Sequence, residues 1–255
     1  MASKKNTARG VDGFAPRKTG NKRRTRNRVV YVLTEGTLTE PMYIDLVREL
    51  ATKRVKLPDG SDSEPNVNIE NDERTNGGTK GPKNPKHSRK PKDLVEHALR
   101  IARKQNREGR AEGLGADEYP VVWCLFDRDQ HEGIDECVEQ VKRFNANSRV
   151  QVRIAYSHPC FELWRLLHHQ PFTSTFGGVC DDAAERLRRA SKQPGDVKVV
   201  LGKYLGRYTN AKKHAEQINK QWADHHKYTK RDPYTDVSTF VEEGLHVLDY
   251  GPPSP

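Results

Sequence analysis

The run VVWCLF, residues 121–126, is the feature that most constrains how this chain can fold. Six consecutive apolar residues leave no polar face, so a strand formed here must be covered on both of its faces. The run ends abruptly in Asp127, Arg128 and Asp129, three charges where a buried strand would simply turn. The sequence therefore predicts a central strand that ends in charged residues with a functional role.

Other strand-like segments alternate with helical patterns along the first two thirds of the chain. RVVYVLT (28–34), NVNIE (66–70) and VQVRIAYS (150–157) are rich in β-branched residues. Between them, apolar residues recur at i, i+3, i+4 and i+7, as in the stretches 43–50 and 134–141. This alternation predicts an α/β protein with a Rossmann-like parallel sheet flanked by helices.

Beyond residue 170 the strand patterns stop, and a smaller C-terminal α-helical lobe is expected. Its predicted helices cover residues 181–192, 209–228 and 233–248. The predicted organisation is a disordered basic arm at 1–27, an α/β domain at 28–170 that includes a basic loop at 71–92, and the helical lobe at 171–250.

Positive charge is concentrated at the N-terminus. The net charge is +10, and residues 1–28 contain ten Lys and Arg against a single acid, Asp12. Such an arm is typical of segments that neutralise nucleic-acid phosphates, although a solubilising leader explains it equally well. The nucleic-acid contacts expected on this basis come from the arm, the basic loop and the lobe: Lys22, Arg23, Arg24, Arg26, Lys80, Lys83, Lys86, Arg89, Lys203 and Arg207.

Apolar runs and cysteines indicate the compartment. No run approaches the roughly 18 residues that cross a membrane, and the N-terminus lacks the apolar core of a secretory signal. Cys124, Cys137, Cys160 and Cys180 form no C-x-x-C pair, and three of them lie in apolar segments typical of buried, reduced thiols. We therefore expect a soluble cytoplasmic protein with no membrane partner.

Acidic side chains follow two of the predicted strands. Glu35 comes directly after 28–34, and Asp127 and Asp129 come after 121–126. The carboxyl ends of parallel strands meet at one edge of a sheet, and residues two apart in extended chain point the same way. Carboxylates gathered there repel one another unless a cation joins them, and oxygen ligands suit Mg²⁺ or Mn²⁺. A D-x-D that only caps the next helix or solvates a loop is the alternative.

The motifs TEGTLTEPMY and FDRD, which follow these strands, resemble a Toprim domain. This is the catalytic module of type IA and type II topoisomerases, bacterial primases and several nucleases. There, one Glu and a D-x-D bind Mg²⁺ for phosphoryl transfer, and Glu35, Asp127 and Asp129 occupy the matching positions. With AYSHPCFELWRLLHH and DPYTDVSTFVEE, the motifs also resemble the RloB-like family over roughly residues 28–250, whose members are often linked to restriction-modification and phage-defence loci.

Two residues near the end of the last predicted strand fit more than one interpretation. Glu162, in the apolar PCFELW segment, is either a fourth acid of the site or a carboxylate favoured by the dipole at a helix N-terminus. His158 stands where the RloB-like pattern has Asn. It is a candidate proton carrier, although a loop histidine is more often just solvated. The sequence does not decide the role of Arg128.

These observations together predict a metal-dependent Toprim-type endonuclease of the RloB-like family. It would cleave DNA or RNA in antiphage defence linked to restriction or abortive infection, with other defence-system subunits as candidate partners. Glu35, Asp127 and Asp129 would bind Mg²⁺ or Mn²⁺, and with Glu162 they would form the catalytic site. Two alternatives stay open: a non-catalytic nucleic-acid-binding or sensing subunit, and a metal enzyme acting on a small phosphorylated molecule.

Overall fold

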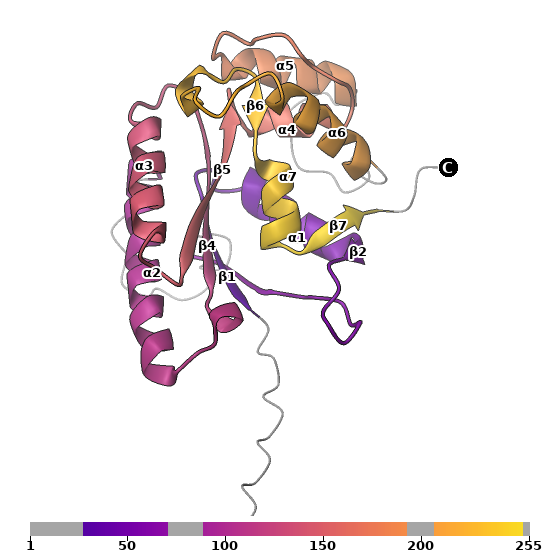
Figure 1. Ribbon diagram of the computed structural model, residues 1–255. Helices are drawn as coiled ribbons and strands as arrows, with labels where there is room; N and C mark the ends of the chain where they lie inside the picture. Colours follow the sequence, from indigo (N-terminus) through magenta and orange to yellow (C-terminus); the bar gives the residue numbers. More distant parts are fainter. Residues whose placement is uncertain (1–27, 71–88, 193–206, 252–255) are drawn as a thin grey trace, which may run out of the picture.

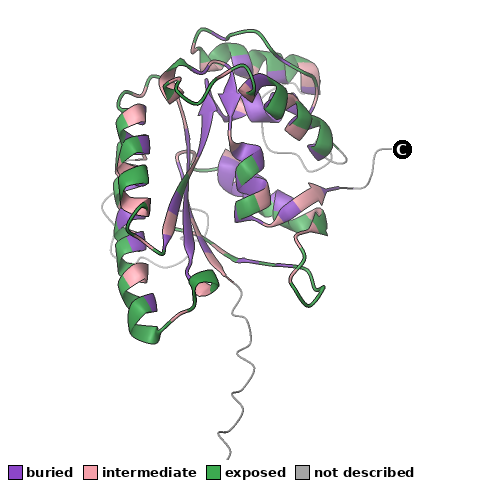
Figure 2. Cartoon of the chain, in the orientation of Figure 1, coloured by how far each residue is buried: buried purple, intermediate pink, exposed green. Residues whose placement is uncertain are grey.

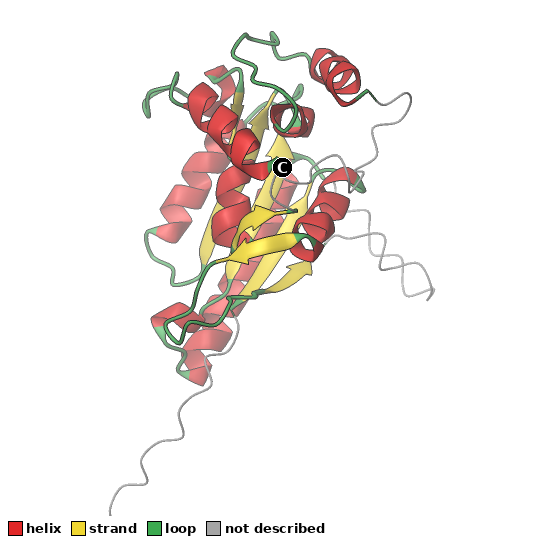
Figure 3. Cartoon of the chain, turned by 90° about the vertical axis from the view of Figure 1, so that its right-hand side faces the viewer, coloured by secondary structure: helices red, strands yellow, loops and turns green. Residues whose placement is uncertain are grey.

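The computed structural model describes residues 28–70, 89–192 and 207–251, and a mixed, mostly parallel sheet forms its middle layer (Figure 1). The strand order is β3-β1-β4-β5-β6. The strands are β1 (Val29–Thr34), β3 (Asn66–Ile69), β4 (Val121–Asp127), β5 (Gln151–His158) and β6 (Tyr234–Thr235). The first four are parallel, and β6 runs antiparallel to β5. Helices cover both faces (Figure 3), so the predicted α/β fold is confirmed.

β4 lies in the middle of the sheet, which explains its unbroken apolar sequence. Successive side chains of a strand point to opposite faces. Trp123 and Leu125 pack into one hydrophobic layer, whereas Cys124 and Phe126 pack into the other. All six residues of the run are buried. Asp127 follows in the same alternation and so lies on the face of Leu125.

Two helices, α2 (Pro91–Glu112) and α3 (Ile134–Asn145), cover one face of the sheet. Pro91 opens α2, where a missing N–H breaks no helical hydrogen bond. Gly113 ends it with φ 68°, a left-handed conformation that glycine adopts without steric cost. Figure 2 shows the consequence of their amphipathic sequences: the outer sides are exposed and the inner sides buried.

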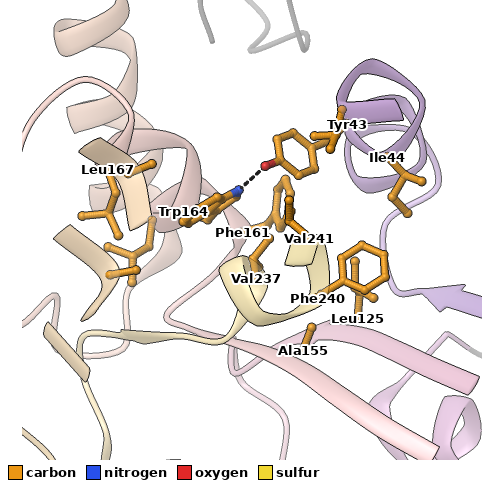
Figure 4. Close-up of a cluster of buried hydrophobic side chains, with 14 of the residues drawn as sticks. Tyr43, Ile44, Leu125, Ala155, Phe161, Trp164, Leu167, Val237, Phe240 and Val241 are labelled. Carbon is orange, nitrogen blue, oxygen red and sulfur yellow. Dashed lines mark hydrogen bonds between the residues drawn. The ribbon is translucent and has the colours of Figure 1, made fainter. Parts of the chain in front are cut away.

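The opposite face is covered by a larger set of helices. These are α1 (Thr39–Glu49), α4 (Phe161–Leu167), α6 (Tyr208–Asn219), α7 (Val237–Thr239) and the π-helical turn η4 (Phe240–Gly244), with α5 (Cys180–Ser191) packed on α4. Trp164 of α4 lies in the middle of this layer, and its indole N–H donates to the hydroxyl of Tyr43 in α1 at 2.7 Å (Figure 4). This buried hydrogen bond links the two helices.

The prediction for the C-terminal segment is partly wrong, because strands continue beyond residue 170. The expected helix at 233–248 is instead β6, α7, η4 and a further strand, β7 (Val247–Tyr250). β7 pairs with β2 (Ala51–Arg54), which the sequence reading missed, in a second, two-stranded sheet. The helix expected at 209–228 ends at Asn219, and two 3-10 turns complete the elements: η1 (Ala116–Glu118) and η3 (Tyr228–Lys230).

The cysteine prediction is confirmed for one pair and wrong for the other. Cys124 and Cys137 are free and buried. Cys160 and Cys180 form a disulfide, with their Cα atoms 5.6 Å apart. The sequence hides this contact because twenty residues separate the two cysteines, and only the packing of α4 against α5 brings them together.

Two further expectations concern membrane spans and the basic segments. Among the described helices, none combines the length and apolar character that a membrane crossing requires. The basic arm at 1–27 and most of the basic loop at 71–92 lie outside the described residues.

Candidate acidic site

The carboxyl ends of β1 and β4 lie side by side, as expected from the parallel α/β arrangement. Thr34 pairs with Leu125, and the backbone N–H of Glu35 extends the ladder by donating to the Leu125 carbonyl at 2.9 Å. β3 lies on the other side of β1, so the winding of the sheet reverses between β1 and β4. Ligands of open α/β sheets bind at such a reversal.

A pocket of about 210 Å³ opens at this point, and its wall is unusually acidic. Its carboxylates come from the ends of β1 and β4 and from the first turns of α1 and α4: Glu35, Glu40, Asp127, Asp129 and Glu162. The structure thus brings the four predicted acids together and adds Glu40. Their roles in metal binding and catalysis stay predictions.

The carboxylates share the pocket without converging on one point. Among the described residues, no three of them have oxygen atoms that all lie within 4.8 Å of one another. Like charges repel strongly where water is scarce, so side chains spread unless a cation draws them together. Glu35, Asp127 and Asp129 therefore share a pocket, and their arrangement around a single ion stays a prediction.

Glu35 is held by two hydrogen bonds. Its Oε2 accepts from the backbone N–H of Asp127 at 2.9 Å, and its Oε1 lies 2.5 Å from Nε2 of His131. About a fifth of each of the Glu35 and His131 side chains is exposed. Sequence reasoning missed His131, although the signal was available in DRDQH, where a histidine follows the D-x-D by two residues.

Glu40 is the most deeply buried acid of the pocket, with 5% of its surface exposed. Its Oε1 accepts from the backbone N–H of Gly36 at 3.1 Å. A Cβ atom at Gly36 would overlap this carboxylate, so the glycine makes room for it. Burial, together with the charges of Glu162 and Glu35, raises the pKa of Glu40 to about 7. Sequence reasoning missed this residue, which stands in the first turn of α1.

The D-R-D turn is fastened to the end of β5. The backbone N–H groups of Arg128 and Asp129 donate to the carbonyls of Ser157 and Pro159 at 2.8 and 3.0 Å. Burial, and then the charges of Glu40 and its acidic neighbours, raises the pKa of Asp127 well above its usual range. The Arg128 guanidinium donates to the carbonyl of Asp129 at 3.3 Å and to that of His131, so it braces its own loop.

Glu162 lies in the first turn of α4 and also faces the pocket, so both of its interpretations stay open. It lines the pocket, and its Oε1 lies 3.4 Å from Nη1 of Arg165, a guanidinium with only 1% of its side chain exposed. His158 differs from the solvated loop histidine that is the commoner case, because it is buried and its Nε2 lies 3.9 Å from Oδ2 of Asp232. Burial lowers the pKa of His158. It is not among the residues that line the pocket.

Two of the predicted nucleic-acid contacts can be located. Arg89 Nη1 donates to the carbonyls of Thr34 and Gly36, each at 3.2 Å, so its charge lies beside the pocket. Arg207 is exposed and hydrogen-bonds to His169 at 2.8 Å. The remaining residues lie outside the described segments: Lys22, Arg23, Arg24, Arg26, Lys80, Lys83, Lys86 and Lys203.

The raised pKa of Glu40 makes stability depend on pH. Its pKa of about 7 exceeds the ordinary 4.5, so between these values the folded protein keeps a proton that the unfolded chain has released. The free energy of unfolding should therefore fall as pH rises through this window, by at most about 3 kcal/mol. We expect Glu40→Gln to flatten this part of the profile, measured as Tm against pH in EDTA.

Glu49→Gln is the matched control for this prediction, because Glu49 is exposed on the same helix. That variant should retain the wild-type slope. Parallel profiles for Glu40→Gln and the wild type would show that Glu40 is ionised throughout.

Fold and site define the class of protein: an α/β protein with an acidic pocket at the carboxyl edge of a mostly parallel sheet. The chain belongs to the RloB-like family, because the family model described as RloB-like protein matches residues 30–243. All five pocket carboxylates lie inside the matched region. A search of curated proteins and a search of solved structures found no match.

Proposed function

We propose that this RloB-like protein is a metal-dependent, Toprim-type endonuclease that cleaves nucleic-acid phosphodiesters in defence against foreign genetic elements. The observation that carries the proposal is the pocket itself. Glu35, Asp127, Asp129 and Glu162, expected to form the site from their positions after the strands, line one pocket with Glu40 at the reversal of the sheet.

The donor set of the pocket fits Mg²⁺ or Mn²⁺ in kind. All five side chains offer carboxylate oxygens, which are the ligands that these ions prefer. Burial, and then the charges of the neighbouring carboxylates, raise the pKa values of Asp127 and Glu40, and a cation in the pocket would offset both effects. Glu35, Asp127 and Asp129 would hold the ion, which would neutralise phosphate charge and polarise the reacting phosphoryl oxygen.

The remaining chemistry falls to the residues around these ligands. His131 and the Asp127 backbone N–H orient the Glu35 carboxylate from opposite oxygens. Glu40 holds a proton near neutral pH, so it can give or take one at the pocket wall. Arg89 lies beside the end of β1, where a guanidinium favours an anionic substrate.

A polymeric substrate is favoured by the distribution of charge along the chain. Ten Lys and Arg precede residue 29, and distributed basic residues bind successive phosphates of a backbone rather than a single small phosphate. Direct defence activity would then follow from destroying foreign nucleic acid or a host RNA.

The test is a cleavage assay on plasmid DNA, single-stranded DNA and tRNA, each with Mg²⁺, Mn²⁺ or EDTA. We expect cleavage of at least one substrate with a divalent ion and none with EDTA. Binding without cleavage under every condition would overturn the enzyme assignment in favour of a sensing subunit. Neither binding nor cleavage of any polymer would overturn the nucleic-acid assignment.

His131 should act as a positioning residue for Glu35. We expect His131→Ala to raise the Mg²⁺ concentration needed for half-maximal cleavage by about 10- to 100-fold, as losses of partners that orient metal ligands do. His131→Gln keeps a hydrogen-bond donor and should recover part of the loss. An unchanged Mg²⁺ requirement in His131→Ala would show that the contact with Glu35 is idle.

A further inference from the structure

We propose that Cys160, Cys180 and Glu162 form a second cation site, for a thiophilic divalent ion such as Zn²⁺, which is available only when the Cys160–Cys180 disulfide is reduced. Among the described residues, this is the one group of three whose candidate ligand atoms, two sulfurs and a carboxylate oxygen, all lie within 4.8 Å of one another. The inference does not depend on the proposed function.

The three ligands are held by different elements that the core keeps together. Cys160 precedes α4 and is buried, Glu162 lies in the first turn of α4, and Cys180 is the first residue of α5. The Sγ of Cys180 lies 3.9 Å from Oε2 of Glu162. All three residues line the acidic pocket, so an ion can reach them and a water can complete its coordination.

The chemistry of this group differs from that of the five-carboxylate wall. Two thiolates and one carboxylate suit Zn²⁺, whereas sites built from oxygen alone suit Mg²⁺ or Mn²⁺. The acidic wall attracts any divalent cation into the pocket. Cys180 also lies at the N-terminus of a twelve-residue helix, where the dipole favours a thiolate.

Disulfide and cation exclude each other because both need the same sulfurs. A dithiol reductant delivers two electrons and two protons to the S–S bond, yielding two thiols and its own disulfide. The incoming divalent ion then displaces the two thiol protons. Oxidation by hydrogen peroxide reverses the outcome: the two cation-bound thiolates lose two electrons, the disulfide re-forms and the cation is released, while the peroxide takes two protons from solvent and leaves as two waters.

The experiment uses the full chain and Co²⁺ as a spectroscopic probe for Zn²⁺. Protein is reduced with a phosphine, freed of reductant and titrated with Co²⁺ without oxygen. We expect a thiolate-to-cobalt charge-transfer band that saturates at one equivalent of Co²⁺, and Zn²⁺ to bleach that band by displacement. Protein whose disulfide is intact should give no band. No band in the reduced protein, or an equal band in the oxidised one, would overturn the proposal.

Variants separate this group from other ligands. Cys180→Ser and Cys160→Ser should each weaken binding by more than the roughly 10- to 100-fold that loss of a mere orienting partner causes. Glu162→Gln should weaken binding and keep the band. Cys137→Ala, which removes a free thiol from the other hydrophobic layer, should keep both band and affinity, and Asp129→Asn, which alters the oxygen wall, should keep the band. Full binding by Cys180→Ser would refute the site.

Discussion

Asp127→Asn should lower metal-dependent cleavage by about a thousandfold or more while leaving the protein folded. A phosphoryl-transfer metal supplies several kcal/mol of charge stabilisation, and about 4 kcal/mol corresponds to three powers of ten in rate. Asp127 is the acid at the end of the central strand, on the face where Glu40 and Glu162 meet it. Asparagine preserves the shape of the side chain and removes its charge.

The same variant should not lose stability in the absence of metal. Because burial and neighbouring carboxylates raise the pKa of Asp127, its ionised form is disfavoured in the folded protein, and the neutral amide removes that penalty. We expect an equal or higher Tm in EDTA, and a smaller rise in Tm on adding Mg²⁺ than the wild type shows.

Asp117→Asn serves as the control, because Asp117 is an exposed acid that precedes β4 and so lies at the opposite edge of the sheet. It should leave both cleavage and the Mg²⁺ response unchanged. Wild-type cleavage by Asp127→Asn would remove the pocket from the mechanism. A variant that fails to fold would instead identify Asp127 as a structural capping residue.

The parts of the fold that could be predicted are those where local pattern and burial agree. The run at 121–126 is apolar on both faces because β4 is central, so its strand assignment follows from sequence alone. β6 is different: Tyr234 and Thr235 form only two residues of strand, paired with the edge of β5. No periodicity can be read from two residues, so the sequence of this segment is as consistent with a helix as with a strand.

The residues of the acidic pocket also differ in whether the sequence could predict them. Glu35 and Asp127 could be predicted because each directly follows a recognisable strand, and parallel strands bring their carboxyl ends to one edge. Glu40 could not, since its first-turn position is explained by the helix dipole whether or not it faces a pocket. The contact of Cys160 with Cys180 depends on how α4 packs on α5, and tertiary packing leaves no signature in local spacing.

Trp164→Ala should be among the most destabilising single changes, at about 3 to 5 kcal/mol, because removing a buried aromatic leaves a cavity that the core cannot refill. Trp164 is fully buried, and its ring lies 4.8 Å from that of His168 and 6.2 Å from that of Tyr208. It also anchors α4, a seven-residue helix that carries Glu162 into the pocket. Urea unfolding should show a lower midpoint with little change in slope.

Two variants divide this loss between packing and hydrogen bonding. Tyr43→Phe keeps the ring and leaves the Trp164 indole N–H without its acceptor, which should cost about 1 to 3 kcal/mol. Trp222→Ala removes the same atoms from a partly buried site, where Nε1 donates to the Pro233 carbonyl at 3.0 Å, and should cost clearly less than Trp164→Ala. If the two tryptophan variants are equally stable, Trp164 does not anchor α4, and the position of Glu162 must depend on Arg165 and the Cys160–Cys180 disulfide alone.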